Sequence, residues 1–167
     1  MFRGCTSLTT APELPATTLV KDCYHSMFQE CTSLTTAPTT LPATTLTVNC
    51  YRQMFQECKA LTTAPELPAT KLEQNCYRGM FQQCTSLTTA PELKAKTLAD
   101  YSCRSMFYLC SSLNYVKCLA TNISATECTY LWLDGVAESG TFVKDSSMSS
   151  WTTGPDGIPA GWTVQNA

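Results

Sequence analysis

Apolar and polar residues follow one another along this chain in a unit of about 26 residues that recurs five times. Met-Phe pairs occur at residues 1–2, 27–28, 54–55, 80–81 and 106–107, in steps of 26, 27, 26 and 26. A cysteine follows each Phe by three residues, and a leucine follows each of these cysteines by three more. A fixed period of this length is typical of repeat proteins, in which each unit buries its apolar face against its neighbours.

The first half of each unit is predicted to be a short helix. In residues 23–31 the apolar positions are Cys23, Met27, Phe28 and Cys31. The spacing i, i+4, i+5, i+8 places them on one face of a helix, and Ser, Gln and Glu occupy the other face.

The second half of each unit is predicted to be a short extended segment. In residues 34–38, Leu-Thr-Thr-Ala-Pro, β-branched Thr and the proline disfavour a helix. Leu8, Ala11, Leu14 and Leu19 recur at equivalent positions and are predicted to point inward. Stacked units would form an α/β solenoid with strands on one side and helices on the other, at a coil spacing of about 4.8 Å. An array of helical hairpins is the alternative, and the frequent prolines argue against it.

The recurring motif, MFxxC-TSL followed by LTTAPxLP, resembles the leucine-rich repeats of BspA-like bacterial surface proteins over residues 1–133. The resemblance implies a right-handed leucine-rich-repeat solenoid of about five 26–27-residue units, the first of them incomplete. Alanine stands where such repeats usually carry larger aliphatic residues, which implies a slimmer core there. These alanines are Ala11, Ala37, Ala64 and Ala90.

The two ends of the chain differ from the repeats. Five of the seven glycines and all three tryptophans lie at or beyond Trp132. We therefore expect residues 134–167 to form a small C-terminal cap that covers the last coil with Trp151 and Trp162; a small binding module is the alternative. Because the chain starts in the middle of a unit, we expect it to be part of a longer protein. An open first coil would allow end-to-end self-association with another copy.

Charge and composition exclude several classes of function. The net charge is −2 and only 14% of residues are charged, which argues against a nucleic-acid partner. No apolar run approaches the roughly 18 residues of a membrane helix, so no membrane insertion is expected. A single His excludes metal sites built from several His, and no C-x-x-C pair points to zinc.

The eleven cysteines are predicted to be mostly buried, unreactive thiols. On packed helices, equivalent cysteines of neighbouring units would lie about 8–10 Å apart, and a disulfide needs Cα atoms within about 7 Å. Disulfides are the alternative, and Cys118 and Cys128, which lie outside the regular unit, are candidates for a pair.

The sequence holds no set of residues that indicates an enzyme. His25 lies on the predicted polar face without a Ser-Asp pair, and the phosphate-binding, nucleophile-elbow and zinc-protease motifs do not occur. We therefore predict no catalytic residues, no metal and no cofactor. Tyr24, Tyr51 and Tyr77 form a column that is expected to pack between helices, with an aromatic binding stripe as the alternative.

Threonine pairs form the most suggestive surface feature. They recur in the extended half of each unit, where stacking would give a flat, weakly charged face rich in hydroxyl groups. The same threonines also suit β structure and solubility, and regularly spaced Thr can bind ice, although the prolines argue against that. The candidate binding residues are Thr9, Thr10, Thr35, Thr36, Thr62, Thr63, Thr88 and Thr89, with Glu13, Glu66 and Glu92 at a shared repeat position.

These observations and the resemblance lead to two expectations of function. The first is a non-enzymatic protein-binding or adhesion module on a bacterial cell surface, or secreted, with a protein or cell-surface ligand. The second is a structural spacer or tip domain of a longer surface or phage-tail-like protein, in which the C-terminal segment or upstream residues carry recognition.

Overall fold

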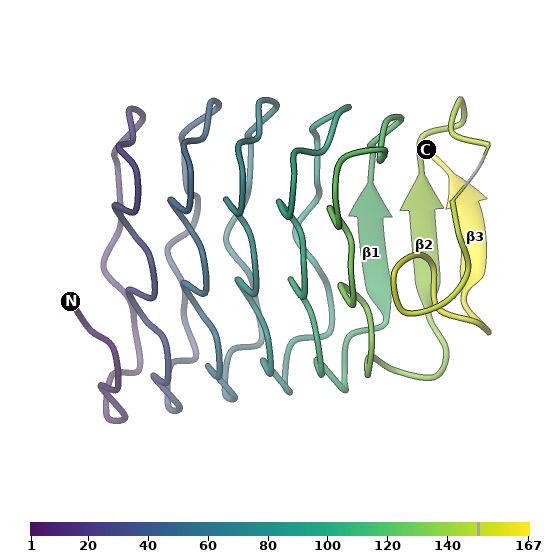
Figure 1. Ribbon diagram of the computed structural model, residues 1–167. Helices are drawn as coiled ribbons and strands as arrows, with labels where there is room; N and C mark the ends of the chain where they lie inside the picture. Colours follow the sequence, from purple (N-terminus) through teal and green to yellow (C-terminus); the bar gives the residue numbers. More distant parts are fainter. Residues whose placement is uncertain (150) are drawn as a thin grey trace.

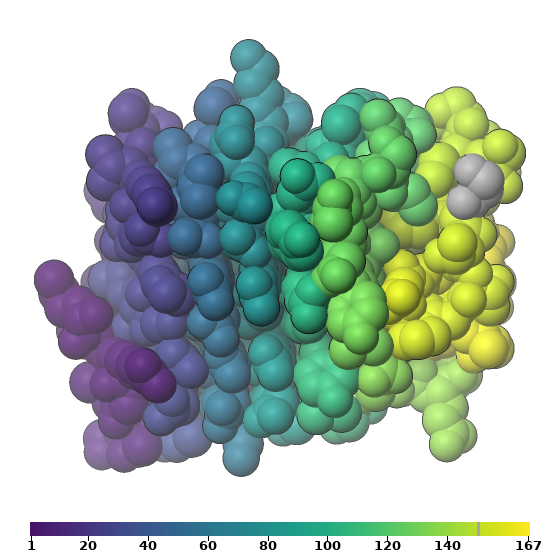
Figure 2. Space-filling view, viewed as in Figure 1, coloured from purple at the N-terminus to yellow at the C-terminus, as the bar shows by residue number. Residues whose placement is uncertain are grey.

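The computed structural model describes residues 1–149 and 151–167 as one stack of coils (Figure 1). The space-filling view shows successive coils as parallel bands across an elongated block (Figure 2). The described residues contain three short strands and no helix. The predicted α/β leucine-rich-repeat solenoid, with helices along one side, is therefore wrong: both sides of the stack are built from extended segments and turns.

One half of each coil, which we call the bridged half, pairs in parallel with the next coil. Its regular part is a sheet of β1 (Tyr115–Cys118), β2 (Thr141–Lys144) and β3 (Thr163–Asn166), in that order. Earlier coils make isolated parallel bridges, among them Thr10–Thr36, Thr36–Thr63, Thr40–Glu66 and Thr45–Lys71. Prolines follow the Thr pairs and have no N–H to donate, so the bridges do not extend into strands there.

The other half, which we call the turned half, consists of the residues that the pattern predicted to form a helix. In residues 22–31, every second N–H bonds to the next coil, as from Tyr24 to the carbonyl of Cys50 (3.0 Å). The N–H groups between them bond three residues back, as from Met27 to Tyr24 (3.2 Å). Half of the hydrogen bonds of this segment therefore close turns, and the other half join coils.

Backbone dihedrals show why no helix forms. Every fourth residue of the turned half has a positive φ, as at Asn49 (58°), Gln53 (54°) and Glu57 (62°). A positive φ at the third residue of a four-residue turn is the signature of a type II turn and interrupts any helix of L-residues. The same order recurs in every coil from residue 22 to residue 135.

Stacked side chains of the turned half fill much of the core. Phe2, Phe28, Phe55, Phe81 and Phe107 form one continuous column, with ring centroids 5.5–5.6 Å apart. Tyr24, Tyr51 and Tyr77 form a second, at 5.8 and 6.2 Å. The prediction that equivalent residues of successive units contact one another is confirmed by these columns.

All eleven cysteines are free thiols, nine of them buried, while Cys5 and Cys23 in the first coil are exposed. The prediction of buried thiols is confirmed for those nine. Four thiols donate to the carbonyl of a Phe in the preceding coil, for example Cys84 to Phe55 at 3.1 Å. The others are Cys31 to Phe2 (3.0 Å), Cys58 to Phe28 (3.1 Å) and Cys110 to Phe81 (2.9 Å).

Residues 134–167 continue the stack, because β2 pairs with β1 and β3 pairs with β2. Trp151 stacks on Trp132 at 5.4 Å and packs edge-on against Phe142 at 5.2 Å. The buried Trp162 donates its indole N–H to the carbonyl of Ala137 at 2.8 Å. In the described part of the chain, no helix is long and apolar enough to span a membrane.

Candidate binding surface

The predicted threonines come together on the bridged half of the first four coils. All eight are exposed. Backbone bridges join Thr10 to Thr36 and Thr36 to Thr63, while Thr35 donates its N–H (2.9 Å) and its hydroxyl (3.1 Å) to the carbonyl of Thr9. Thr89 of the fourth coil is bridged to Tyr115 of the fifth, so the columns end there. We call the surface formed by the eight predicted threonines the threonine surface.

A hollow of about 510 Å³ lies on the threonine surface between the second and third coils. Five hydroxyl groups and one carboxylate line it, with Ala and Pro as its apolar part. Its residues are Thr35, Thr36, Ala37, Pro38, Thr39, Thr62, Thr63, Ala64 and Glu66. A second hollow of about 220 Å³, lined in part by Pro91, Glu92 and Lys94, shares Ala64 and Glu66 with the first. We call the larger hollow the groove.

The three predicted glutamates have different surroundings. Glu13 accepts hydrogen bonds from the N–H (3.0 Å) and hydroxyl (3.1 Å) of Thr39 in the next coil. Glu92 forms an ion pair with Lys117 at 3.0 Å. The exposed Glu66 lines both hollows, and its backbone carbonyl accepts from the N–H of Leu41 at 3.0 Å. Of the three carboxylates, that of Glu66 is therefore the best placed to meet a ligand.

Thr39 lines the larger hollow but was not among the predicted residues. It lies opposite Glu13, because the one-residue insertion in the second unit places Thr39 and Thr40 where other units have a single residue. An alignment of the units position by position would have found it.

His25 and the tyrosine column lie on the turned half, away from the threonine surface. His25 is exposed and its Nε2 lies 3.4 Å from the side-chain oxygen of Gln53. Tyr51 and Tyr77 are buried in the core, which leaves only Tyr24 half-buried in that column. In the described residues, no three His, Cys, Asp or Glu side chains converge closely enough to hold a metal ion.

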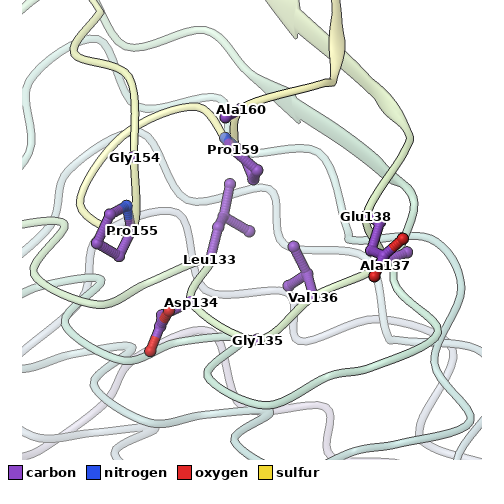
Figure 3. A pocket seen from close by; sticks show the side chains of 10 residues that line it. All are labelled: Leu133, Asp134, Gly135, Val136, Ala137, Glu138, Gly154, Pro155, Pro159 and Ala160. Atoms are coloured by element: carbon purple, nitrogen blue, oxygen red, sulfur yellow. The ribbon is translucent and has the colours of Figure 1, made fainter.

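A further pocket, of about 260 Å³, lies between residues 133–138 and 154–160 (Figure 3). Its lining is mostly apolar, including Leu133, Val136 and Pro159. The carboxylates of Asp134 and Glu138 lie on different sides of it (Figure 3), so they do not form a pair that could share a proton.

Comparison of the chain with family models, with curated proteins and with solved structures finds no match.

Proposed function

We propose that this protein is a non-enzymatic recognition module that binds a protein or cell-surface ligand across the threonine surface. The observation that carries the proposal is the groove on that surface, lined by five hydroxyl groups, Glu66 and apolar Ala and Pro residues. Such a lining offers donors and acceptors without much charge, and the stacked coils hold it in place. With the resemblance to BspA-like repeats, it supports adhesion at a bacterial cell surface or in the extracellular space.

The contacts would be spread over several coils rather than concentrated in one pocket. Each threonine contributes one hydroxyl group, and a single hydrogen bond adds about 0.5–1.5 kcal/mol. Single threonine substitutions are therefore expected to weaken binding only a few-fold. Glu66 adds one negative charge to the groove, which favours a partner that presents a basic side chain there.

The experiment is binding of the purified chain to immobilised extracellular-matrix proteins and to whole host cells. A triple variant, Thr36→Ala with Thr63→Ala and Glu66→Gln, should lose at least ten-fold in affinity. The matched control replaces Thr17, Thr18 and Thr70 by Ala, since all three are exposed outside the groove. Equal binding by the two variants would contradict the proposal.

The second candidate function is a structural spacer or tip domain in which residues 134–167 carry recognition. It is favoured by a hollow of about 270 Å³ at the C-terminal end of the stack, lined by Trp151, Trp162 and Val164 among others. Deleting the segment would remove Phe142 and Trp151, which pack on the buried Trp132, so a point substitution is the better test. Val164 is 46% exposed. If Val164→Glu abolishes binding and the threonine variant does not, recognition belongs to this end.

End-to-end self-association is part of the same proposal. β3 is exposed along its length at one end of the stack, and Val20 is 69% exposed in the first coil at the other. Exposed strand edges pair readily with other chains. Sedimentation velocity over a range of concentrations should show assemblies larger than one chain, and Val20→Lys should shift them to monomer. A monomer at every concentration would contradict this part.

A further inference from the structure

One histidine and three arginines form a column on the turned half, apart from the threonine surface. His25, Arg52, Arg78 and Arg104 occupy equivalent positions, 27, 26 and 26 residues apart. Backbone hydrogen bonds join their coils directly, from Gln53 to Arg78 (2.8 Å) and from Gly79 to Arg104 (2.9 Å). Neighbouring coils paired in this way lie about 4.8 Å apart. The backbones of the three arginines therefore lie on adjacent coils at about this spacing.

Only the last arginine of the column has an acidic partner. Arg104 forms an ion pair with Glu127 and lies over the ring of Tyr130, 4.6 Å from its centroid. In the described part of the chain, neither Arg52 nor Arg78 takes part in an ion pair; Arg78 donates only a long 3.4 Å hydrogen bond to Asn75. The repulsion between these two charges is therefore not offset by an ion pair.

Three acidic side chains of the turned half make contacts outside this column. Asp22 accepts from the side-chain amide of Asn49 at 2.8 Å, and Asp100 accepts from the backbone N–H of Thr126 at 2.8 Å. Glu57 lies 3.5 Å from the side-chain amide of Gln56. None of them forms an ion pair with an arginine of this column.

The same turn holds most of the buried polar atoms without a hydrogen-bond partner. Five such side-chain atoms occur among the described residues, and four belong to residues 47–52. One is Nε of Arg52, a cationic donor. Burial lowers the pKa of Arg78, and the charges of Arg52 and Arg104 lower it further. An unpartnered cationic donor and charge that no ion pair offsets are what an anion would satisfy.

We propose that Arg52 and Arg78 form a binding site for a divalent tetrahedral oxyanion, either free sulfate or phosphate or the phosphate monoester of a larger ligand. Two guanidinium groups match its two charges, and their planar forks can donate to its oxygens in pairs. The site lies on the turned half and is independent of the threonine surface, so either can exist without the other.

The test uses NMR of the side-chain Nε–H groups of the ¹⁵N-labelled chain. Titration with sodium sulfate, at constant ionic strength set by sodium chloride, should shift the Arg52 and Arg78 signals along a saturating curve. Arg52→Gln and Arg78→Gln should each weaken binding at least ten-fold. Arg3→Gln is the matched control, because it removes one positive charge at an exposed ion pair with Glu30. It should leave the curve unchanged.

Further titrations distinguish the sources of the anion. Inorganic phosphate tests the second free ion, and glucose 6-phosphate tests a doubly charged phosphate monoester. Tighter binding of the monoester than of both free ions would assign the site to a larger phosphorylated ligand. Non-saturating shifts, shifts equal for all arginines, or the same response to chloride alone would overturn the proposal. Thermal denaturation of each variant without anion separates loss of the site from loss of folding.

Discussion

The two halves of each coil use the same stacking for different purposes. In the turned half, side chains of Phe, Tyr, Met and Cys point inward, and those of the central coils are almost wholly buried. In the bridged half, the inward residues are smaller, Ala and Leu, and the Thr pairs stay exposed. Most of the large buried side chains lie in the turned half, so we expect most of the stability to come from there. The bridged half presents a regular surface and contributes fewer large side chains to the core.

The difference is sharpest in the hydrogen bonds of the cysteines and threonines. The Sγ–H of Cys84 reaches a carbonyl of the preceding coil inside the core, whereas the hydroxyl of Thr35 does the same at the surface. Substitutions in the turned half should therefore change stability, and those in the bridged half should change binding. The predictions below test this division, beginning with the largest expected effect.

Raising the pH should unfold the protein between about pH 9 and 11. Burial raises the pKa of Cys50 to about 11 and those of Cys58, Cys110 and Cys118 to about 12. Burial also raises the pKa values of Cys76, Cys84 and Cys103. As the pH rises, thiols of the unfolded chain lose their protons before the buried thiols of the folded chain do. The free energy of unfolding is therefore unaffected below about pH 9. Above that pH it falls by about 1.4 kcal/mol per pH unit for each thiol. Over two pH units, seven thiols would outweigh the 5–15 kcal/mol that stabilises a typical domain.

Circular dichroism and urea titrations at pH 7 to 11 measure this loss. Six of the seven thiols lie in the turned half, and Cys118 lies in β1. The control is Cys5→Ser, because Cys5 is exposed and its variant should unfold at the same pH as the parent. A free energy of unfolding that stays constant up to pH 11 would show that deprotonation of the buried thiols does not destabilise the fold.

Phe55→Ala should cost about 3–5 kcal/mol of unfolding free energy, because it leaves a large cavity. Phe55 is fully buried between Phe28 (5.5 Å) and Phe81 (5.6 Å). Phe2→Ala is the matched control, since Phe2 stacks on one ring only at the end of the column and should cost about half as much. Thr63→Ala in the bridged half should change stability by less than about 0.5 kcal/mol. Urea denaturation compares the three, and equal losses would refute the division between the halves.

The repeat period predicted which residues stack, but not the local structure that stacks them. The apolar positions 23, 27, 28 and 31 fit one helix face, and the helix was the structure expected from them. With Tyr24 included, the buried set becomes two adjacent residues every fourth position, as at Cys50, Tyr51, Met54, Phe55 and Cys58. A helix turns 100° per residue, so over eight residues it drifts by about 80° from a strict period of four. That strict period was the signal for turns rather than a helix.

The same error affected the reasoning on cysteines. Free thiols were predicted because packed helices would hold equivalent cysteines too far apart. Coils joined by backbone hydrogen bonds, such as Tyr24 to Cys50, are only about 4.8 Å apart, which lies within the range of a disulfide. The structure instead shows four of the thiols donating to carbonyl groups, which the sequence did not reveal. The threonine positions, by contrast, could be predicted because exposure follows directly from the repeat.

Gly79→Ala should cost about 1–2 kcal/mol. Gly79 has φ +60° in the turned half, and a Cβ there would lie 3.2 Å from the side-chain oxygen of Gln82 and 3.3 Å from Cγ of Gln53. Ser105 occupies the equivalent position of the next coil with φ 52°. Ser105→Ala adds no Cβ, so it is the control and should change stability by less than about 0.5 kcal/mol. Thermal denaturation measures both, and a neutral Gly79→Ala would mean that the turn tolerates the strain.

The smallest effect should come from the glutamates of the bridged half. The ion pair between Glu92 and Lys117 is about one-third exposed on both sides, so Glu92→Gln should cost about 0.2–1 kcal/mol. Glu66→Gln should leave stability unchanged but weaken ligand binding, because Glu66 faces the groove without an ion-pair partner among the described residues. A double-mutant cycle with Lys117→Gln at low salt and at 1 M salt isolates the pair, whose energy should vanish at high salt. If Glu66→Gln destabilised the fold more than Glu92→Gln, Glu66 would have to be a structural residue, and the groove would lose its one charged contact for a ligand.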